Sequence, residues 1–361
     1  MLTTLTTRSF RNLADQSFAP VSGANLVYGP NGAGKSSLLE AAYLAATTRS
    51  FRTPRLKECC RLGDESLGVS AEVDGDERVR LEVSWGPEGK RRAVNGKAVP
   101  IVEHLSVLPI VSWTARDNEI FQGPPAVRRL LLDRGIVSEQ PACLLVISEY
   151  RRALEAKRAA LDGQGAALEE WNRLLARHGA ELAARRARFV GLLEGALNDV
   201  LERSDLDLGG VELRYRPSPA ESLGGEDDLF GALAKLSRRE LARRVALAGP
   251  HRDDVDILWR NGPVGRMASA GERKALGLAL MVAQARLVAR RGPHPLCLID
   301  DFDAELDHRR VGELWKLLGG ASQLVAATSR NSVVNELSAK GKWSLEGGNL
   351  ANLRQTAEKS L

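Results

Sequence analysis

The chain has 361 residues, of which 43% are hydrophobic and 27% are charged, as expected for a globular protein with a substantial core. Lys and Arg outnumber Asp and Glu by 51 to 46, and the resulting net charge of +5 permits a polyanionic partner without requiring one. No apolar run reaches the roughly 18 residues that a membrane-spanning helix needs, which argues against a membrane partner.

The amino terminus and the cysteines bear on the compartment. Residues 1–8 alternate in polarity like an edge strand and lack the apolar block of a signal peptide. The cysteines match neither a disulfide framework nor a metal-ligand pattern; they are Cys59, Cys60, Cys143 and Cys297. We therefore expect a cytoplasmic protein.

The segment from Gly29 to Ser36 has the two glycines, four intervening residues, lysine and serine of a phosphate-binding loop. Glycines let the backbone turn tightly, so that its N–H groups can surround phosphate oxygens. Lys35 can reach the β- and γ-phosphates of ATP, and the Ser36 hydroxyl can bind Mg²⁺. The residues expected to contact the nucleotide are Gly29, Pro30, Asn31, Gly32, Ala33, Gly34, Lys35, Ser36 and Ser37.

The surroundings of this loop favour the same interpretation over an ordinary Gly-rich turn. Residues 24–28 predict a short buried strand, and residues 36–44 predict a helix whose positive N-terminus faces the phosphates. Residues 67–73 and 79–85 then alternate like strands, and Asn95-Gly96 tolerates the positive φ angles of a hairpin turn. An antiparallel sheet is therefore expected beside the nucleotide site.

The middle of the chain, from about residue 125 to 204, is rich in helix formers. Two antiparallel helices are expected at 146–161 and 167–201, with apolar stripes that indicate core packing. Farther on, residues 208–215 predict a strand, 221–228 a loop, and the chain from 270 a mostly parallel sheet with helices. The expected division is a head in two parts, 1–112 and 208–361, separated by a helical lobe at 113–207.

Residues 295–299 predict a buried strand that ends in two carboxylates, Asp300 and Asp301. Alone, this pattern also fits two surface acids in a turn, but such a strand is the expected partner of a phosphate loop. Asp300 can hold Mg²⁺ directly or through water, and Asp301 can orient or deprotonate an attacking water. With Lys35, these are the candidate catalytic residues.

Ser269 and Gly271 form a small turn before a predicted helix at 275–285. Taken alone, the turn fits an ordinary capped helix, with Ser269 as N-cap and Glu272 at the third helical position. Its place shortly before the two-carboxylate strand resembles the signature loop of ATP-binding-cassette ATPases. That resemblance implies that Ser269 and Gly271 contact a γ-phosphate held by the phosphate loop of a second copy.

Two later segments extend the cassette resemblance. Residues 304–307 resemble the short D-loop that follows the catalytic carboxylate in these ATPases. The strand predicted at 324–329 ends where they usually carry a switch histidine, and Thr328 occupies that point here. The chain departs from the pattern at this position.

Within the cassette group, the chain resembles the RecF family over nearly its whole length. Six segments in order carry the match: 25–39, 48–52, 123–133, 249–254, the signature segment 269–274, and 300–307. The resemblance implies an α/β fold: a cassette-type ATPase head like that of Rad50, with a mixed sheet and an antiparallel β subdomain, and a compact helical second lobe. It also implies ATP-dependent homodimerisation, weak DNA-stimulated ATP hydrolysis, and binding to duplex DNA, gapped DNA or single-strand–duplex junctions. RecO and RecR are the implied partners in gap repair, where they help to load recombinase.

Some positions depart from the RecF pattern. Residues 112–118 replace a usual acidic stretch, and Glu272-Arg273 replaces a usual Gln-rich pair. Gln122 is a candidate for the Q-loop glutamine. Candidates for contact with DNA phosphates, which equally fit solvated surface or structural ion pairs, are Arg49, Arg52, Arg55, Arg128, Arg129, Arg151 and Arg152.

The leading hypothesis is a DNA-binding ATPase in which two copies close around two ATP molecules. Other classes share the phosphate loop. A small-molecule phosphotransferase needs no signature turn and acts as a monomer. A transporter subunit has its loop and signature much closer along the chain. A non-hydrolysing scaffold of the same ATPase group remains the alternative nearest to the leading one.

Overall fold

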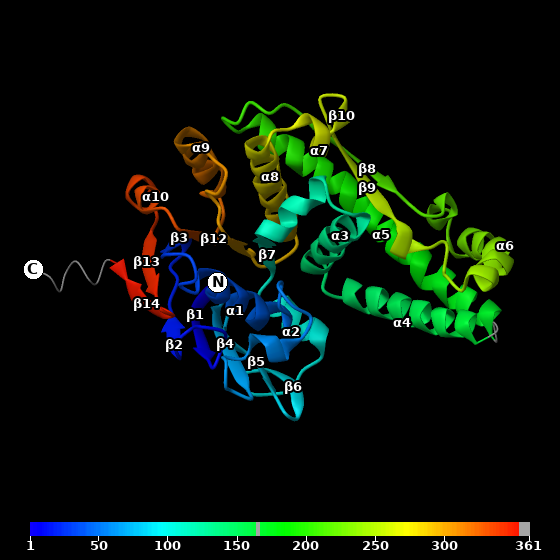
Figure 1. Cartoon of the computed structure of the whole chain (residues 1–361), viewed down its shortest axis with the longest axis horizontal. Coiled ribbons are helices and arrows are strands. Elements are labelled where there is room, and N and C mark those ends of the chain that lie inside the picture. Colours follow the sequence, from blue (N-terminus) through cyan, green and yellow to red (C-terminus); the bar gives the residue numbers. More distant parts are fainter. Residues whose placement is uncertain (164–166, 354–361) are drawn as a thin grey trace, which may run out of the picture. The chain divides into compact units, whose positions relative to one another are not determined.

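The computed structural model describes residues 1–163 and 167–353, and the chain forms two compact units (Figure 1). Unit 1 comprises residues 1–116, 200–208 and the chain from 270 onward. Unit 2 comprises residues 117–199 and 209–269. Within the described residues, no helix is long and apolar enough to cross a membrane.

A six-stranded sheet forms the centre of unit 1, with the strand order β14-β13-β3-β12-β11-β7. All neighbours pair in parallel except β14 with β13. Strands β11 and β12 are buried along their whole length, so their sequences are nearly continuous apolar runs. The strands are β3 (Gly23–Tyr28), β7 (Ile110–Trp113), β11 (Leu296–Ile299), β12 (Gln323–Thr328), β13 (Gly341–Glu346) and β14 (Asn349–Asn352).

A second sheet in unit 1 is antiparallel, with the order β2-β1-β4-β5-β6. Buried and partly exposed residues alternate along β4, so one face of this sheet packs on the core and the other meets solvent. Helix α1 contacts strands of both sheets and therefore lies between them. The strands are β1 (Leu2–Arg8), β2 (Gln16–Phe18), β4 (Leu67–Asp74), β5 (Arg78–Gly86) and β6 (Gly89–Val94).

The helices of unit 1 pack closely on these sheets. A Cβ atom on Gly277 of α8 would lie 2.2 Å from the Trp113 indole of β7, so glycine permits this close approach of helix and strand. The helices are α1 (Lys35–Thr47), the short 3₁₀ turn η1 (Leu56–Cys59), α2 (Ile101–Val107), α8 (Ala270–Ala289), α9 (His308–Leu318) and α10 (Asn331–Glu336). The predicted α/β head with a mixed sheet and an antiparallel subdomain is confirmed.

Unit 2 is mainly helical, and the helices predicted at 146–161 and 167–201 are confirmed as α4 and α5. Its main helices are α3 (Pro125–Glu139), α4 (Cys143–Asp162), α5 (Leu168–Glu202, whose end belongs to unit 1) and α6 (Glu226–Arg243). Its short helical segments are η2 (Ala115–Phe121, which begins in unit 1), η3 (Ala220–Leu223), η4 (Pro250–Arg252) and α7 (Val264–Met267).

A small antiparallel sheet, in the order β10-β9-β8, also belongs to unit 2. Its strands are β8 (Val211–Arg216), β9 (Asp254–Trp259) and β10 (Gly262–Pro263). The sequence predicts that residues from 208 onward belong to the head. The structure instead packs residues 209–269 with the helices, because β9 lies against α3.

Two local predictions differ from the structure, and a third is confirmed. Strand β1 is not an edge strand, because the short strand β2 pairs along its outer side. The loop expected at 221–228 is largely helical. The acidic residues from Glu226 onward form the first turn of α6, where their negative charges interact favourably with the positive end of the helix dipole. Asn95 and Gly96 adopt positive φ, at 50° and 75°, and Val94 pairs with Lys97 across them in an antiparallel bridge, so the predicted hairpin turn is confirmed at the end of β6.

Candidate phosphate-binding site

The predicted phosphate loop joins β3 to α1 in unit 1 and has the backbone geometry that its glycines permit. Gly32 and Gly34 have φ angles of 80° and 112°, which residues with a Cβ rarely adopt. A Cβ atom on Gly29 would lie 2.2 Å from the carbonyl oxygen of Leu345 on β13. Both the turn and its packing on the sheet therefore depend on glycine.

Lys35 begins α1 and is buried, with 6% of its surface exposed. Its Nζ donates hydrogen bonds to the carbonyl oxygens of Gly29 at 2.7 Å and Pro30 at 3.0 Å. The ammonium group is thus held inside the loop by its backbone. A cation in this place suits an anion bound at the N-terminus of α1.

The two predicted carboxylates follow β11, as expected. The Asp300 amide donates to the carbonyl oxygen of Trp113 on the neighbouring strand β7. Burial raises the pKa of Asp300, although a hydrogen bond with the Ser36 side chain acts in the opposite direction. Its Oδ1 atom is buried and has no hydrogen-bond partner among the described residues. Such an orphaned carboxylate oxygen next to Ser36 fits a site for a divalent cation.

The described residues contain no cluster of three or more His, Cys, Asp or Glu side chains that could hold a metal ion by itself. Mg²⁺ commonly binds to one or two protein oxygens, with water and substrate phosphates completing its shell. Ser36 and Asp300 fit that requirement, and their proximity agrees with the predicted pair.

Asp301 has a left-handed backbone conformation with a φ of 48°, and the side chain of Lys274 binds to its backbone. The Nζ atom of Lys274 donates to the Asp301 carbonyl oxygen at 3.0 Å. Burial lowers the pKa of Lys274, and the carboxylates of Asp301, Glu305, Asp300 and Asp303 act in the opposite direction. Because Lys274 lies on α8, this bond ties the turn after β11 to the helix that begins beside Gly271.

A cavity of about 630 Å³ in unit 1 brings these elements together. Its lining includes six residues of the phosphate loop and the start of α1, together with Asp301, which follows Ser37 by 264 positions (301 − 37). The six are Asn31, Gly32, Gly34, Lys35, Ser36 and Ser37. Its lining also includes residues that were not predicted from the sequence as part of the site, among them Arg11, Asn12 and Arg61.

Asn12 and Arg11 brace the loop from the turn after β1. Asn12 donates to the Gly32 carbonyl oxygen at 2.8 Å and accepts from the Ser37 hydroxyl at 2.9 Å. Arg11 makes two hydrogen bonds, at 3.0 and 2.8 Å, to the fully buried Glu40 of α1. No short motif announces these residues, because a turn with Arg11 at a φ of 51° brings them to the loop.

The segment after Asp301 is ordered by Thr328 rather than by a histidine. The buried Thr328 hydroxyl donates to Asp303 Oδ2 at 2.9 Å and accepts from the Arg330 amide at 3.0 Å. Arg330 also donates to the Leu306 carbonyl oxygen and lies 3.4 Å from the Asp303 carboxylate. The predicted D-loop is therefore fixed to the end of β12 by a threonine and an arginine.

The predicted signature turn lies where the two units join along the chain. Ser269 is the last residue of unit 2, and Gly271 is the second residue of α8 in unit 1. Ser269 is exposed and Gly271 is partly exposed. A Cβ atom on Gly271 would lie 3.5 Å from the Glu305 carbonyl oxygen of the D-loop segment. Gln122, in contrast, belongs to unit 2, where its amide donates to the Gly265 carbonyl oxygen.

The segments 123–133 and 249–254 meet inside unit 2 through ion pairs. Arg128 makes bidentate hydrogen bonds to Asp254 at 2.6 and 3.0 Å, and Arg129 donates to the Asp253 carbonyl oxygen. Arg186 of α5, which is 3% exposed, bonds to both Asp133 and Asp253. These two segments therefore hold unit 2 together.

Replacing Arg186 with Met is expected to destabilise the chain by about 3–5 kcal/mol, because it leaves the buried Asp253 carboxylate without its cation and Asp133 with only the half-exposed Arg151. Urea unfolding monitored by circular dichroism measures the change. Arg185→Met on the same helix is the matched control, since its ion pair with Glu181 is partly exposed and worth at most about 1 kcal/mol. Equal stabilities of the two variants would contradict this reading of the network.

The structure divides the arginines predicted to meet DNA phosphates. Arg128 and Arg129 are engaged in unit 2, Arg151 pairs with Asp133, and Arg152 pairs with Glu149. In unit 1, Arg52 lines the phosphate-loop cavity beside Glu40, and Arg55 lies 3.8 Å from Glu58. Arg49 is exposed near Lys90.

The chain is similar to known proteins in both sequence and fold. A family described as an AAA domain matches residues 4–117. The DNA replication and repair protein RecF of Geotalea daltonii is 32% identical, covering 94% of this chain and 97% of its own. A solved structure of the recombination mediator protein RecF with ATP, described as part of the RecFOR pathway, is 26% identical with a TM-score of 0.87 and covers 98% and 97% of the two chains. An Smc head bound to a ScpA winged-helix domain is 17% identical, with a TM-score of 0.57 over 99% of each chain, and shares the fold.

Proposed function

This chain belongs to the RecF family of DNA replication and repair proteins, and from that premise we propose that it is an ATP-dependent DNA-binding protein of recombinational gap repair and replication restart. The observation that carries the proposal is the meeting of the phosphate loop and Asp301 at one cavity, with the orphaned Oδ1 of Asp300 buried after the same strand. The described residues contain neither a helix that could cross a membrane nor a cluster of metal-ligating side chains that would point to a different function.

The phosphate loop and its lysine bind the nucleotide in this proposal. The amides from Gly32 to Ser37 and the ammonium group of Lys35 contact the phosphates of ATP. Ser36 and Asp300 hold Mg²⁺, which neutralises phosphate charge. Asp301 orients the attacking water and accepts its proton, and Lys274 keeps the Asp301 backbone in place. The expected activity is slow ATP hydrolysis that DNA stimulates.

A second copy of the chain completes the site. Ser269 and Gly271, both accessible in one copy, contact the γ-phosphate bound to the other copy. ATP then favours the dimer because it binds the dimer better than the monomer, and hydrolysis releases it. The dimer binds duplex or gapped DNA, or a single-strand–duplex junction, and acts with RecO and RecR in the cytoplasm. Four unpaired cysteines support a reducing compartment.

Replacing Asp301 with Asn is the experiment that separates binding from chemistry. We expect ATP affinity within about threefold of wild type and a fall in kcat of about 10²- to 10⁴-fold, because an amide cannot accept the proton of the attacking water. Single-turnover hydrolysis with gapped DNA measures the step. Asp64→Asn, an exposed carboxylate in the same unit, is the control. Unchanged turnover in Asp301→Asn would remove this residue from the mechanism.

A further inference from the structure

Beyond the residues already considered for DNA contact, we propose that the outer face of the antiparallel sheet in unit 1 docks the phosphodiester backbone of DNA. This inference rests on the proposed function and assigns its DNA partner to a surface. We call this surface the β-face. Its principal side chains are Thr6 and Arg8 of β1, Ser70 of β4, Arg80, Glu82 and Ser84 of β5, and Arg91 of β6.

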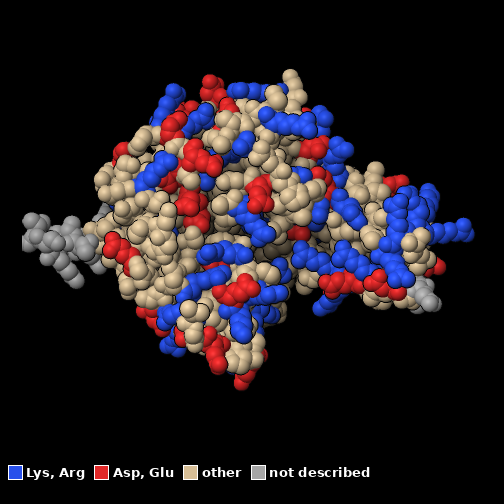
Figure 2. Space-filling view, in the orientation of Figure 1, with Lys and Arg blue, Asp and Glu red and all other residues tan. Residues whose placement is uncertain are grey.

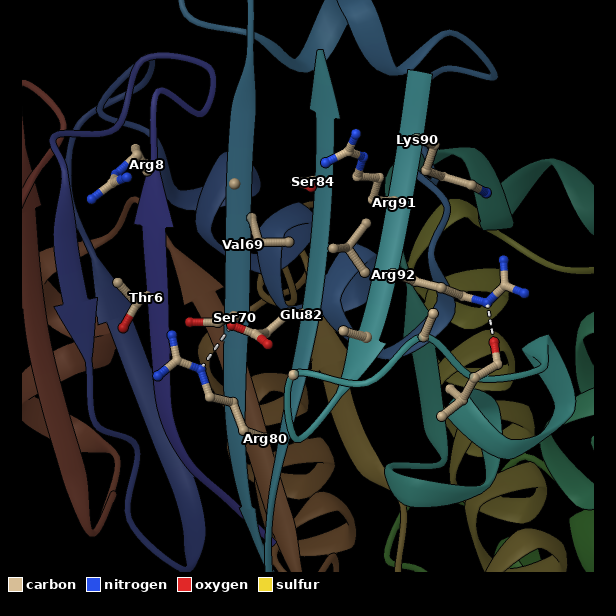
Figure 3. Close-up of a pocket in the computed structure, with 16 residues that line it drawn as sticks. Thr6, Arg8, Val69, Ser70, Arg80, Glu82, Ser84, Lys90, Arg91 and Arg92 are labelled. Atoms are coloured by element: carbon tan, nitrogen blue, oxygen red, sulfur yellow. Dashed lines mark hydrogen bonds and ion pairs between the residues drawn. The ribbon is translucent and has the colours of Figure 1, made fainter. Parts of the chain in front are cut away.

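The register of the sheet shapes the β-face into a trough. In one row across the sheet, Arg8 pairs with Gly68, which pairs with Ser84, which pairs with Arg91. In the next row the order is Thr6, Ser70, Glu82 and Ala93. In the first row, the small residues Gly68 and Ser84 thus form a low floor between the long basic side chains of Arg8 and Arg91. Figure 3 shows Arg8 on one side of the sheet and Arg91 on the other, with Ser70 and Ser84 between them.

The hollow over this face has a volume of about 850 Å³ and a strong excess of positive charge. Arg8, Arg80 and Arg91 of the β-face line it against the single acid Glu82. Lys90 and Arg92 also belong to the lining, but their register partners Trp85 and Val83 lie on the opposite face of β5. The whole chain has nearly balanced charge, at 51 to 46, and Figure 2 shows both signs mixed over most of the visible face. The three-to-one excess of basic residues on the β-face is therefore a local property of the trough and suits a polyanion.

The arginines of the β-face are available for exchange with phosphates. Arg80 pairs with Glu82 at 3.2 Å and Arg91 pairs with Glu88, but all four side chains are at least 35% exposed. Exposed pairs of this kind contribute at most about 1 kcal/mol each. Arg8 is exposed as well. A phosphate can therefore replace the carboxylate partners at little cost.

Two further cations of β6, Lys90 and Arg92, project from the face of the strand opposite to Arg91. Lys90 donates to the carbonyl and hydroxyl oxygens of Thr48, and Arg92 donates to the Val99 carbonyl oxygen. The pKa of Lys90 is lowered by burial and then by the guanidinium groups of Arg49 and Arg92. Lys90, Arg92 and Arg49 thus form a second group of cations at the β6 edge of the sheet.

The chemistry of the lining favours the backbone of DNA over its bases. None of the residues that line the hollow is aromatic, so the face offers no platform for base stacking. Guanidinium and hydroxyl groups are the usual donors to phosphate oxygens. Arg8 and Arg91 stand three strands apart, about 14 Å at the usual strand spacing, which is comparable with the ~12 Å width of the major groove. Because the contacts are to phosphates and not to bases, we expect binding to be independent of DNA sequence.

The test compares Arg8→Gln/Arg91→Gln with Arg309→Gln/Lys316→Gln, which removes two exposed charges from α9 of the same unit. Binding of a labelled duplex is measured by fluorescence anisotropy with ATP–Mg²⁺ over a series of salt concentrations. We expect the β-face variant to bind at least tenfold more weakly at low salt, and its log Kd–log salt slope to fall by about two, while the control retains the wild-type slope.

Three outcomes would contradict the assignment of DNA to the β-face, and they separate its failure from a failure of the proposed function. A β-face variant with the wild-type slope overturns this assignment and leaves the face to a protein partner, while the proposed function stands. A wild-type chain that binds no duplex with or without ATP overturns both. The charge reversal Arg8→Glu/Arg91→Glu should abolish binding with thermal unfolding unchanged, because both side chains are exposed. Retained binding in that variant would also contradict the proposal.

Discussion

Replacing Lys35 with Ala is expected to weaken ATP binding by at least about 100-fold. The ammonium group is buried within the loop and donates to the carbonyl oxygens of Gly29 and Pro30, so it is already positioned for phosphate oxygens. Charge-assisted hydrogen bonds of this kind are worth about 1.5–3 kcal/mol each, and each 1.4 kcal/mol is tenfold in affinity. Titration with a fluorescent ATP analogue measures the loss.

Stability must be followed alongside affinity in the Lys35→Ala variant. Removing the ammonium group leaves two loop carbonyl oxygens without a donor, which can cost about 1–3 kcal/mol. A thermal melt shows whether the variant is folded at the temperature of the titration. Lys57→Ala, an exposed lysine in the same unit, is the control and should bind ATP like wild type. A folded Lys35→Ala chain with affinity within about threefold of wild type would refute the role given to this residue.

Replacing Ser269 with Arg should leave ATP binding by the monomer intact but prevent the ATP-dependent dimer. Ser269 is exposed, so the folded chain can accommodate the longer side chain. In the proposed dimer the same position faces a γ-phosphate across the subunit boundary, where an arginine does not fit between turn and nucleotide. Analytical ultracentrifugation with ATP–Mg²⁺ measures the dimer, and nucleotide titration measures binding.

The control for Ser269→Arg is Ser106→Arg, which adds the same group at an exposed serine of α2. It should dimerise like wild type, since nothing in the proposal places α2 against the partner's nucleotide. If Ser269→Arg dimerises fully with ATP, the signature turn does not act across a subunit boundary. The phosphate loop and its ATP would then belong to a protein that works by another route.

The elements around the phosphate loop could be predicted well because each has a local cause. Positions 32 and 34 have positive φ angles, which favour glycine. Strands β11 and β12 are apolar runs buried on both faces, and Asp300 and Asp301 follow directly after β11. None of these features depends on distant contacts for its recognition. The fold class and the family resemblance follow from the same segments.

Features that arise from tertiary pairing were not predictable in this way. Strand β1 lies inside its sheet only because the three-residue strand β2 pairs beside it, and so short a strand has no clear sequence signal. Asn12 reaches the loop through a left-handed turn, and residues 209–269 join unit 2 through β9 and α3. Arg128 was considered for DNA, but its bidentate pair with Asp254 depends on two segments 126 residues apart. The Ser269 and Gly271 roles stay predictions, because they require a second copy.

The oligomeric state with and without ATP–Mg²⁺, each in the presence and absence of a gapped duplex, tests the central claim most directly. Light scattering coupled to size exclusion reports the mass, and Asp301→Asn prevents loss of nucleotide during the run. We predict a monomer without nucleotide and a dimer with ATP–Mg²⁺, which the gapped duplex stabilises further. A chain that saturates with ATP yet keeps the mass of a monomer at high concentration, with and without DNA, would contradict it.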